Sequence, residues 1–125
     1  MKPEELRFST EHEWIEPGKE AARMGVSDYA QKELTDVVYV ELPEVGREVK
    51  RGDAIVVLES VKATSDVYAP APGKISAVNN ELEDNPQKIN EDPYGEGWLV
   101  EIELSDAAPL DELMDYTAYE EYLKA

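Results

Sequence analysis

Apolar and acidic residues alternate most clearly near the C-terminal end of the chain, between Trp98 and Leu104. Successive side chains of a strand point to opposite faces, so this period of two predicts a strand with one solvated face. Two further runs, Val37–Leu42 and Ala54–Leu58, are rich in β-branched and other apolar residues, which predicts two buried strands. Glycine and proline separate such runs at short intervals, as in short strands joined by turns. The pattern therefore predicts a mainly β fold.

Helical patterns occur in only two parts of the chain. The first follows Ser27, a residue type that caps helix N-termini because its hydroxyl accepts a backbone hydrogen bond from the first turn. Ala30 and Leu34 then lie four residues apart, on one helical face. We expect a short internal helix from Ser27 to about Leu34.

The second helical pattern is in the C-terminal segment, at about 107–124. Three apolar residues after Pro109 share one helical face: Leu110, Leu113 and Met114. Thr117–Glu120 has the spacing of a capping box, which predicts that another helix begins at Thr117. We expect these helices to dock on the β core.

Composition indicates a folded protein and restricts its partners. The 125 residues, 42% hydrophobic and 33% charged, are enough for one domain, residues 1–125. A formal net charge of −17 opposes binding to nucleic acid or to an anionic membrane surface. The longest purely apolar run, Ala54–Leu58, is far shorter than the ~20 residues of a membrane-spanning helix. We expect a soluble monomer without a targeting segment.

Two scarce residue types restrict the catalytic and metal-binding chemistry that the chain could perform. Cysteine is absent, which excludes disulfides, thiolate metal sites and cysteine nucleophiles, and favours the cytoplasm as the compartment. His12 is the only histidine, so a multi-histidine metal site is impossible and a catalytic triad would have to use this one residue. We expect His12 to pack against the first strand, and the composition favours a protein that is not an enzyme.

Lys62 has the most informative position of any lysine in the chain. An apolar strand ends near Leu58 and a second extended segment begins near Ser65, so the connection between them is the tip of a hairpin at about 54–70. A lysine at such a tip is often no more than a solvated charge. The alternative is that a modifying enzyme acylates this exposed amine and converts it into a long flexible arm.

Five blocks of sequence resemble, in order and spacing, the glycine cleavage system H protein family: Glu11–Trp14, Asp28–Gln31, Val40–Gly46, Glu59–Pro70 and Asp92–Trp98. The blocks span nearly the whole chain. The resemblance implies a barrel-sandwich hybrid of the lipoyl-domain kind, with the internal and C-terminal helices added to it. It also implies that Lys62 carries covalent lipoic acid and that the chain is a carrier, not an enzyme.

The resemblance further implies a set of partners. The lipoyl arm would accept an aminomethyl group from glycine decarboxylase, pass its methylene unit to tetrahydrofolate at an aminomethyltransferase, and be reoxidised by dihydrolipoamide dehydrogenase. An enzyme that attaches lipoyl or octanoyl groups would modify Lys62. Lysine and lipoate together span roughly ten bonds of about 1.5 Å, which gives a reach on the order of 10–15 Å.

A cleft that shelters the loaded arm is also implied by the resemblance. By position, Glu13 and Asp66 correspond to the carboxylates that hold the arm in the family, and we expect Ala63 and Tyr29 in the same cleft. A carboxylate there would accept a charge-assisted hydrogen bond from the terminal ammonium. The plainer alternative is that both are solvated acids. Tyr29 departs from the family pattern, since many members have a histidine at this position.

Other interpretations share the tip lysine. A biotin carrier usually resembles Met-Lys-Met at the tip, and a lipoyl domain of a 2-oxoacid dehydrogenase complex resembles Asp-Lys-Ala, whereas Val61 and Ala63 flank Lys62 here. An H-like scaffold, or a protein that relays lipoate to other enzymes, would have the same sequence as a carrier. Only the modification state and partner assays separate those two from the carrier.

Overall fold

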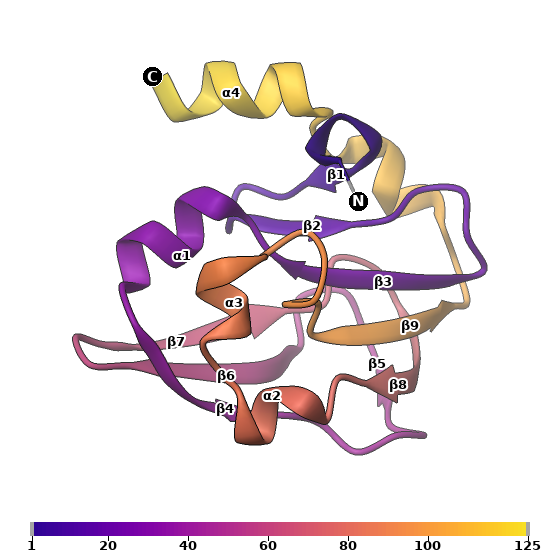
Figure 1. Ribbon diagram of the computed structural model, residues 1–125. Helices are drawn as coiled ribbons and strands as arrows, with labels where there is room; N and C mark the ends of the chain where they lie inside the picture. The colour runs from indigo at the N-terminus through magenta and orange to yellow at the C-terminus, as the bar shows by residue number, and fades with distance from the viewer. Residues whose placement is uncertain (1, 125) are drawn as a thin grey trace.

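The computed structural model describes residues 2–124, which form two antiparallel sheets with helices at their margins (Figure 1). The larger sheet has six strands in the order β1 (Arg7–Phe8), β2 (Glu13–Ile15), β3 (Ala21–Val26), β9 (Val100–Leu104), β8 (Gly73–Val78) and β5 (Glu48–Val49). The smaller sheet has three, in the order β4 (Val37–Glu41), β6 (Ala54–Ser60) and β7 (Thr64–Tyr68). The mainly β class is therefore confirmed.

The main core lies between the two sheets and takes side chains from both. Leu58 and Val67 of the smaller sheet belong to one buried cluster with Ile75 and Ile102 of the larger sheet. Each such side chain contributes about 1.5–3 kcal/mol by leaving water. This packing of one sheet on the other is the expected barrel-sandwich arrangement.

The strand with alternating residues and the central apolar strand are confirmed. In β9, Val100 and Ile102 are buried while Glu103 is exposed, as a period of two requires. In β6, Ile55, Val56 and Leu58 are buried because this strand lies between β4 and β7 and packs on the core, whereas Ala54 at its start is exposed. Both features follow from the local pattern of side chains.

The prediction that Val37–Leu42 forms a buried strand is wrong in part. A strand forms there, but Val38 and Tyr39 are 54% and 53% exposed. β4 is an edge of the smaller sheet, and its register with β6 shifts between Val37 and Tyr39. An irregularity of this kind turns two consecutive side chains away from the core, which the run of apolar letters does not reveal.

The internal helix is confirmed. α1 spans Asp28–Leu34, and the Ser27 hydroxyl caps it by accepting the backbone N–H of Ala30 at 3.2 Å. It ends at Thr35, whose φ of 62° breaks the helical path and turns the chain into β4. The cap and the break together place α1 beside the smaller sheet (Figure 1).

The expectation that helices occur in only two places is wrong. Two single-turn helices, α2 (Glu81–Asp84) and α3 (Lys88–Glu91), lie between β8 and β9. Each buries one apolar side chain, Leu82 or Ile89. A helix of one turn has no repeat of apolar residues at three and four positions, so periodicity cannot detect it.

The C-terminal segment is helical, with two corrections to its boundaries. The residues around Pro109 form a 3-10 helix, η2 (Ala108–Glu112), in place of an α-helix. The last helix, α4, spans Tyr116–Lys124 and begins one residue before the predicted Thr117. The carboxylate of Asp115 accepts the N–H of Ala118 at 2.8 Å, so Asp115 does the capping that was predicted for Thr117.

Docking of the C-terminal segment on the β core is confirmed. Leu110 joins the main core, and the Tyr119 ring of α4 stacks on Phe8 of β1 with centroids 4.5 Å apart. α4 also contacts the N-terminal 3-10 turn η1 (Pro3–Glu5), as Figure 1 shows above the larger sheet. No helix within residues 2–124 is long and apolar enough to cross a membrane.

Candidate functional site

Lys62 occupies the middle of a three-residue tip between β6 and β7. The hydroxyl of Ser60 accepts the backbone N–H groups of Lys62 and Ala63 at 3.2 and 3.0 Å, and the Ser60 N–H donates to the Ala63 carbonyl at 2.8 Å. The N–H of Val61 donates to the carbonyl of Asp36, just before β4, at 3.1 Å. Ser60 and Asp36 therefore hold the tip rigidly, at the far end of the hairpin that projects at the left of Figure 1.

The side chain of Lys62 is exposed and points toward the end of α1. Its Nζ donates to the carbonyl of Glu33 at 3.2 Å. The last carbonyls of a helix carry partial negative charge, which favours an ammonium group there. Among the described residues this is the one hydrogen bond of the Lys62 amine, and it is exposed to solvent.

A cavity of about 260 Å³ lies beside the tip, between α1 and β7. Its lining includes all four residues predicted for a cleft: Glu13, Tyr29, Ala63 and Asp66. They come from four segments, namely β2, α1, the hairpin tip and β7. The fold thus brings together side chains as far apart in sequence as 13 and 66, next to the lysine that would carry an arm.

Glu13 is the buried acid of this cavity. The residue is 4% exposed, and its carboxylate accepts hydrogen bonds from the backbone N–H of Tyr68 and from the hydroxyl of Ser9 at 2.9 Å. Burial raises the pKa of Glu13 to about 7, against the two hydrogen bonds, which lower it. At neutral pH this carboxyl group therefore changes its charge readily in response to a new neighbour.

The stability of the protein should depend on pH through Glu13. Folding raises the pKa of this residue from 4.5 to about 7, so the folded chain binds the proton more tightly than the unfolded chain. This favours folding at low pH, and the contribution is lost as the pH rises toward about 7. We expect the Glu13→Gln variant to gain roughly 2–3 kcal/mol in unfolding free energy relative to the parent between pH 5 and pH 8. Urea unfolding at several pH values measures this, and parallel profiles for the two proteins would contradict it.

Asp66 differs from Glu13 in its surroundings. It lies on β7 opposite Val57 and is exposed at the rim of the cavity. Water screens an exposed carboxylate, so its interaction with a bound group is weaker than that of a buried one. The geometry favours Glu13 over Asp66 as the acid that interacts most strongly with any ligand of this cavity.

Tyr29 forms part of the wall next to His12. Its side chain is 38% exposed, and its ring centroid lies 4.7 Å from that of His12. His12 is packed, but its described ring contacts are to Tyr29 of α1 and to Tyr119 and Tyr122 of α4, and not to the first strand as expected. Burial lowers the pKa of His12 below the usual 6.5. A neutral imidazole and a phenol thus line this side of the cavity.

The family model described as Glycine cleavage H-protein matches residues 6–125 of the chain. The chain belongs to this family. A glycine cleavage system H protein from Symbiobacterium thermophilum is 51% identical over 122 residues, which cover 98% of this chain and 95% of that protein. A Thermotoga maritima protein of the same name is 50% identical over 116 residues, covering 93% of this chain and 94% of that protein.

A solved structure of the H-protein family shares the whole fold. The crystal structure of a glycine cleavage system H protein from Mycobacterium marinum matches with a TM-score of 0.90 and 35% identity, covering 99% of this chain and 100% of that chain. H proteins are carriers, so this chain is a carrier of the glycine cleavage system and not a catalyst. Family membership sets aside the biotin carrier and the lipoyl domain of another complex.

Two residues that do not line the cavity of this H protein, but position elements that do, escaped the sequence analysis. Ser9 accepts the backbone N–H groups of Glu11 and Glu13, each at 3.2 Å, and donates to the Glu13 carboxylate, so it orients that side chain. Asn90 of α3 donates to the carbonyl of Thr35 at 2.7 Å and accepts the N–H of Val37 at 2.9 Å. It therefore fixes the junction between α1 and β4. No local signal in the sequence identifies either contact.

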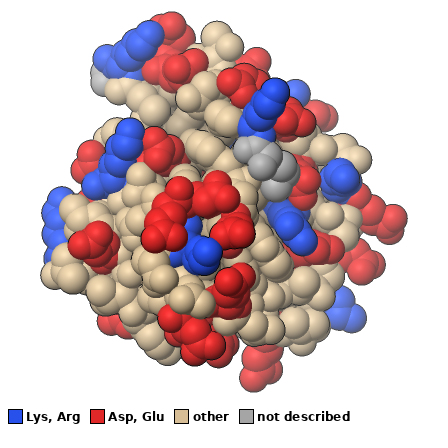
Figure 2. Space-filling model, in the orientation of Figure 1, with Lys and Arg blue, Asp and Glu red and all other residues tan. Residues whose placement is uncertain are grey.

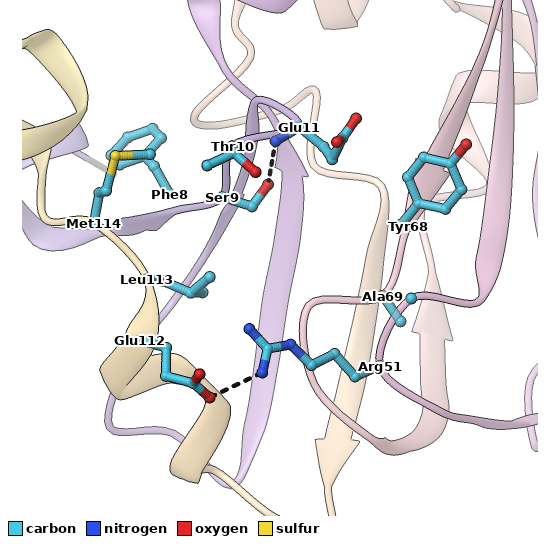
Figure 3. Close-up of a pocket in the computed structure, with 11 residues that line it drawn as sticks. Phe8, Ser9, Thr10, Glu11, Arg51, Tyr68, Ala69, Glu112, Leu113 and Met114 are labelled. Atoms are coloured by element: carbon cyan, nitrogen blue, oxygen red, sulfur yellow. Dashed lines mark hydrogen bonds and ion pairs between the residues drawn. The ribbon is translucent and has the colours of Figure 1, made fainter. Parts of the chain in front are cut away.

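A second hollow, of about 450 Å³, lies beyond the other end of β7 (Figure 3). It is bordered by Ser9, Tyr68 and an ion pair in which Arg51 Nη1 lies 2.9 Å from Glu112 Oε2. Both partners of the pair are about half exposed or more, so the pair contributes little to stability. None of the residues predicted for the arm lines this hollow.

Proposed function

We propose that Lys62 is lipoylated and that the arm carries an aminomethyl group from glycine decarboxylase to a tetrahydrofolate-dependent aminomethyltransferase. Lipoic acid on Lys62 would supply the exchange and redox chemistry, and dihydrolipoamide dehydrogenase would reoxidise its dithiol. One observation carries the proposal: an exposed lysine on a rigid tip lies beside a cavity that contains a buried carboxyl group. The residues present suit a slender arm that ends in a cation.

The length of the hairpin supports this fit. Glu13 accepts the backbone N–H of Tyr68, at the end of β7, whereas Lys62 precedes the start of β7 at Thr64. The six residues from Lys62 to Tyr68 span at most about 20 Å of strand. A lipoyl-lysine reach on the order of 10–15 Å, the two further bonds of an aminomethyl group, about 3 Å, and a hydrogen bond of about 3 Å together cover this distance when the arm is extended.

Glu13 would stabilise the loaded arm by accepting a hydrogen bond from its terminal ammonium. A positive charge beside the carboxyl group favours its ionised form, and the pKa of about 7 lets Glu13 lose its proton as the arm docks. Water is largely kept from this carboxylate, so the interaction is stronger than at the surface. The same burial slows attack of water on the bound group.

Acidic residues around the tip would guide the partner enzymes. Glu33, Asp36, Glu59 and Asp66 are exposed in this region, and acidic side chains also outnumber basic ones on the face in Figure 2. With a net charge of −17, attraction to basic entrances on the partners acts over about one Debye length, roughly 10 Å at 0.1 M salt and 3 Å at 1 M.

The rate of association with glycine decarboxylase should therefore fall as salt is added, and Glu59→Lys should lower it further at low salt. Glu20→Lys is the matched control, because Glu20 is an exposed acid in the β2–β3 turn and does not line the cavity. Stopped-flow measurements at several salt concentrations give both results. Rates that do not respond to salt would show that the acidic excess only solvates the protein.

Reconstitution with glycine, the three partner enzymes, tetrahydrofolate and NAD⁺, which accepts the electrons when the dithiol is reoxidised, tests the proposal as a whole. The lipoylated chain should sustain many cycles of glycine cleavage, measured as carbon dioxide and methylene-tetrahydrofolate formed per carrier. Transfer of lipoate to other proteins without glycine cleavage would favour the lipoate-relay alternative. A chain that binds the partners but stays unmodified in its host would favour the scaffold.

A further inference from the structure

The hydroxyl of Tyr119 joins the C-terminal helix to two elements that line the arm cavity. It lies 2.7 Å from Ser27 Oγ and 2.8 Å from His12 Nδ1. The backbone N–H of Ser27 donates to the carbonyl of His12 at 2.9 Å. Tyr119, Ser27 and His12 thus contact one another along all three sides, and we call them the Tyr119 triangle.

Two corners of the Tyr119 triangle control parts of the cavity wall. His12 lines the cavity and directly precedes Glu13, and Ser27 caps α1, whose residues Tyr29 and Ala30 also line it. Tyr119 itself does not line the cavity, and it is 1% exposed. Any effect of Tyr119 on a bound arm must therefore pass through His12 and Ser27.

We propose that Tyr119 is a positioning residue for the lipoyl arm: its hydroxyl holds His12 and the N-terminus of α1 in the arrangement that lets Glu13 and the cavity wall enclose the loaded arm. The inference rests on the proposed carrier function, because only that function gives the cavity an arm to enclose. It makes the C-terminal helix a part of the arm site, although the helix does not touch the arm.

The hydrogen-bond donors of the Tyr119 triangle can be assigned. The Ser27 oxygen accepts the N–H of Ala30, so its proton is free to go to Tyr119, whose own proton then goes to His12 Nδ1. In the reverse arrangement the Ser27 hydroxyl proton, on a fully buried residue, has no acceptor among the described hydrogen bonds. Buried donors are rarely left unpaired. His12 is therefore neutral with its proton on Nε2.

The ionisation of the two side chains agrees with this assignment. Burial raises the pKa of Tyr119 to about 12, so the phenol keeps the proton that it donates. Burial also lowers the pKa of His12, despite the carboxylates of Glu11 and Glu33, which raise it. A neutral histidine has the free Nδ1 lone pair that the Tyr119 hydroxyl needs.

Packing of the helix does not depend on this hydroxyl. The Tyr119 ring stacks on Phe8 at 4.5 Å with 7° between the planes, and phenylalanine would make the same contact. Tyr116, on the same helix, also packs on Phe8, at 5.7 Å, and makes no described contact with Ser27 or His12. Tyr119→Phe and Tyr116→Phe therefore remove the same atom from the same helix, but only the first removes it from the Tyr119 triangle.

The first test measures the lifetime of the aminomethyl-loaded carrier without the transferase. Tyr119→Phe removes two neutral hydrogen bonds, to Ser27 and His12, and the arm senses this loss only through those two residues. We expect it to shorten the lifetime roughly 3- to 10-fold, equivalent to one neutral hydrogen bond, while Tyr116→Phe leaves it at the parent value. An unchanged lifetime in Tyr119→Phe, or equal shortening in both variants, overturns the proposal. A parent whose lifetime matches that of Glu13→Ala would overturn the sheltering role of the cavity and, with it, the role of Tyr119.

The second test uses the unmodified chain. It therefore distinguishes failure of the role proposed for Tyr119 from failure of the proposed carrier function. His12 is the only histidine, so its two ring nitrogens give unambiguous ¹⁵N signals. At pH 8 the unmodified chain should show Nδ1 unprotonated and accepting a hydrogen bond, and this signal should move in Tyr119→Phe but not in Tyr116→Phe. A protonated Nδ1, or a signal unmoved by Tyr119→Phe, overturns the assignment even where the arm cavity works as proposed.

Discussion

Replacing Lys62 with arginine should abolish lipoylation and, with it, glycine–bicarbonate exchange by glycine decarboxylase. Arginine keeps the positive charge, but its guanidinium is not acylated as the lysine amine is. The side chain is exposed and its described hydrogen bond is to the carbonyl of Glu33, so the unfolding free energy should change by less than about 0.5 kcal/mol. The exchange assay and urea unfolding measure the two results.

Lys74→Arg is the control for the Lys62 prediction. Lys74 is an exposed lysine on β8, in the larger sheet, and the same change there should leave both lipoylation and exchange intact. Exchange that persists in Lys62→Arg would mean that another residue carries the group. Loss of exchange in both variants would mean that replacing a lysine by arginine disturbs the protein generally, and it would not assign the modification to Lys62.

Replacing Glu13 with alanine should shorten the lifetime of the aminomethyl-loaded carrier by roughly 10- to 100-fold. The change removes one charge-assisted hydrogen bond of about 1.5–3 kcal/mol that exists only when the arm is sheltered. Asp66→Ala should have a smaller effect in the same direction, because Asp66 is exposed and its charge is screened. The loss of ammonia and formaldehyde in the absence of the transferase measures the lifetime.

Lipoylation of Glu13→Ala should stay at the parent level, which is the internal control. The modifying enzyme meets Lys62 on the open tip, about a strand length from the Glu13 carboxylate. Equal lifetimes for the parent and Glu13→Ala would mean that the arm docks elsewhere. Lower lipoylation of the variant would mean that the change disturbs the hairpin itself.

Local patterns in the sequence predicted two of the elements that carry the site, α1 and the hairpin of β6 and β7, but not β2, which carries Glu13. The cap at Ser27 and the apolar run of β6 each depend on residues close together in the chain, and both place a wall or the tip beside the cavity. The exposure of Tyr39 depends on the register between β4 and β6, which no local pattern records. The helix α3 has a single turn, so it has no repeat of apolar residues that could predict it or the contacts of Asn90.

The membership of the cavity was predicted from the resemblance to the H-protein family and not from spacing. Nothing in the local sequence shows that Glu13 meets the backbone of Tyr68, 55 residues away, or that this contact buries it. The raised pKa of Glu13 follows from that burial and so is a property of the fold. Likewise, the contact of Tyr119 with His12, 107 residues apart, needs the docked C-terminal helix.

Mass-spectrometric peptide mapping of the chain, purified from cells that contain its lipoyl-attaching enzyme, tests the central claim most directly. The account predicts one lipoylated peptide, the one that contains Lys62, because this amine is held at an exposed and rigid tip. Lipoate on Lys50 or Lys74, or a chain that stays unmodified while other lipoyl proteins in the same cells are lipoylated, would contradict it.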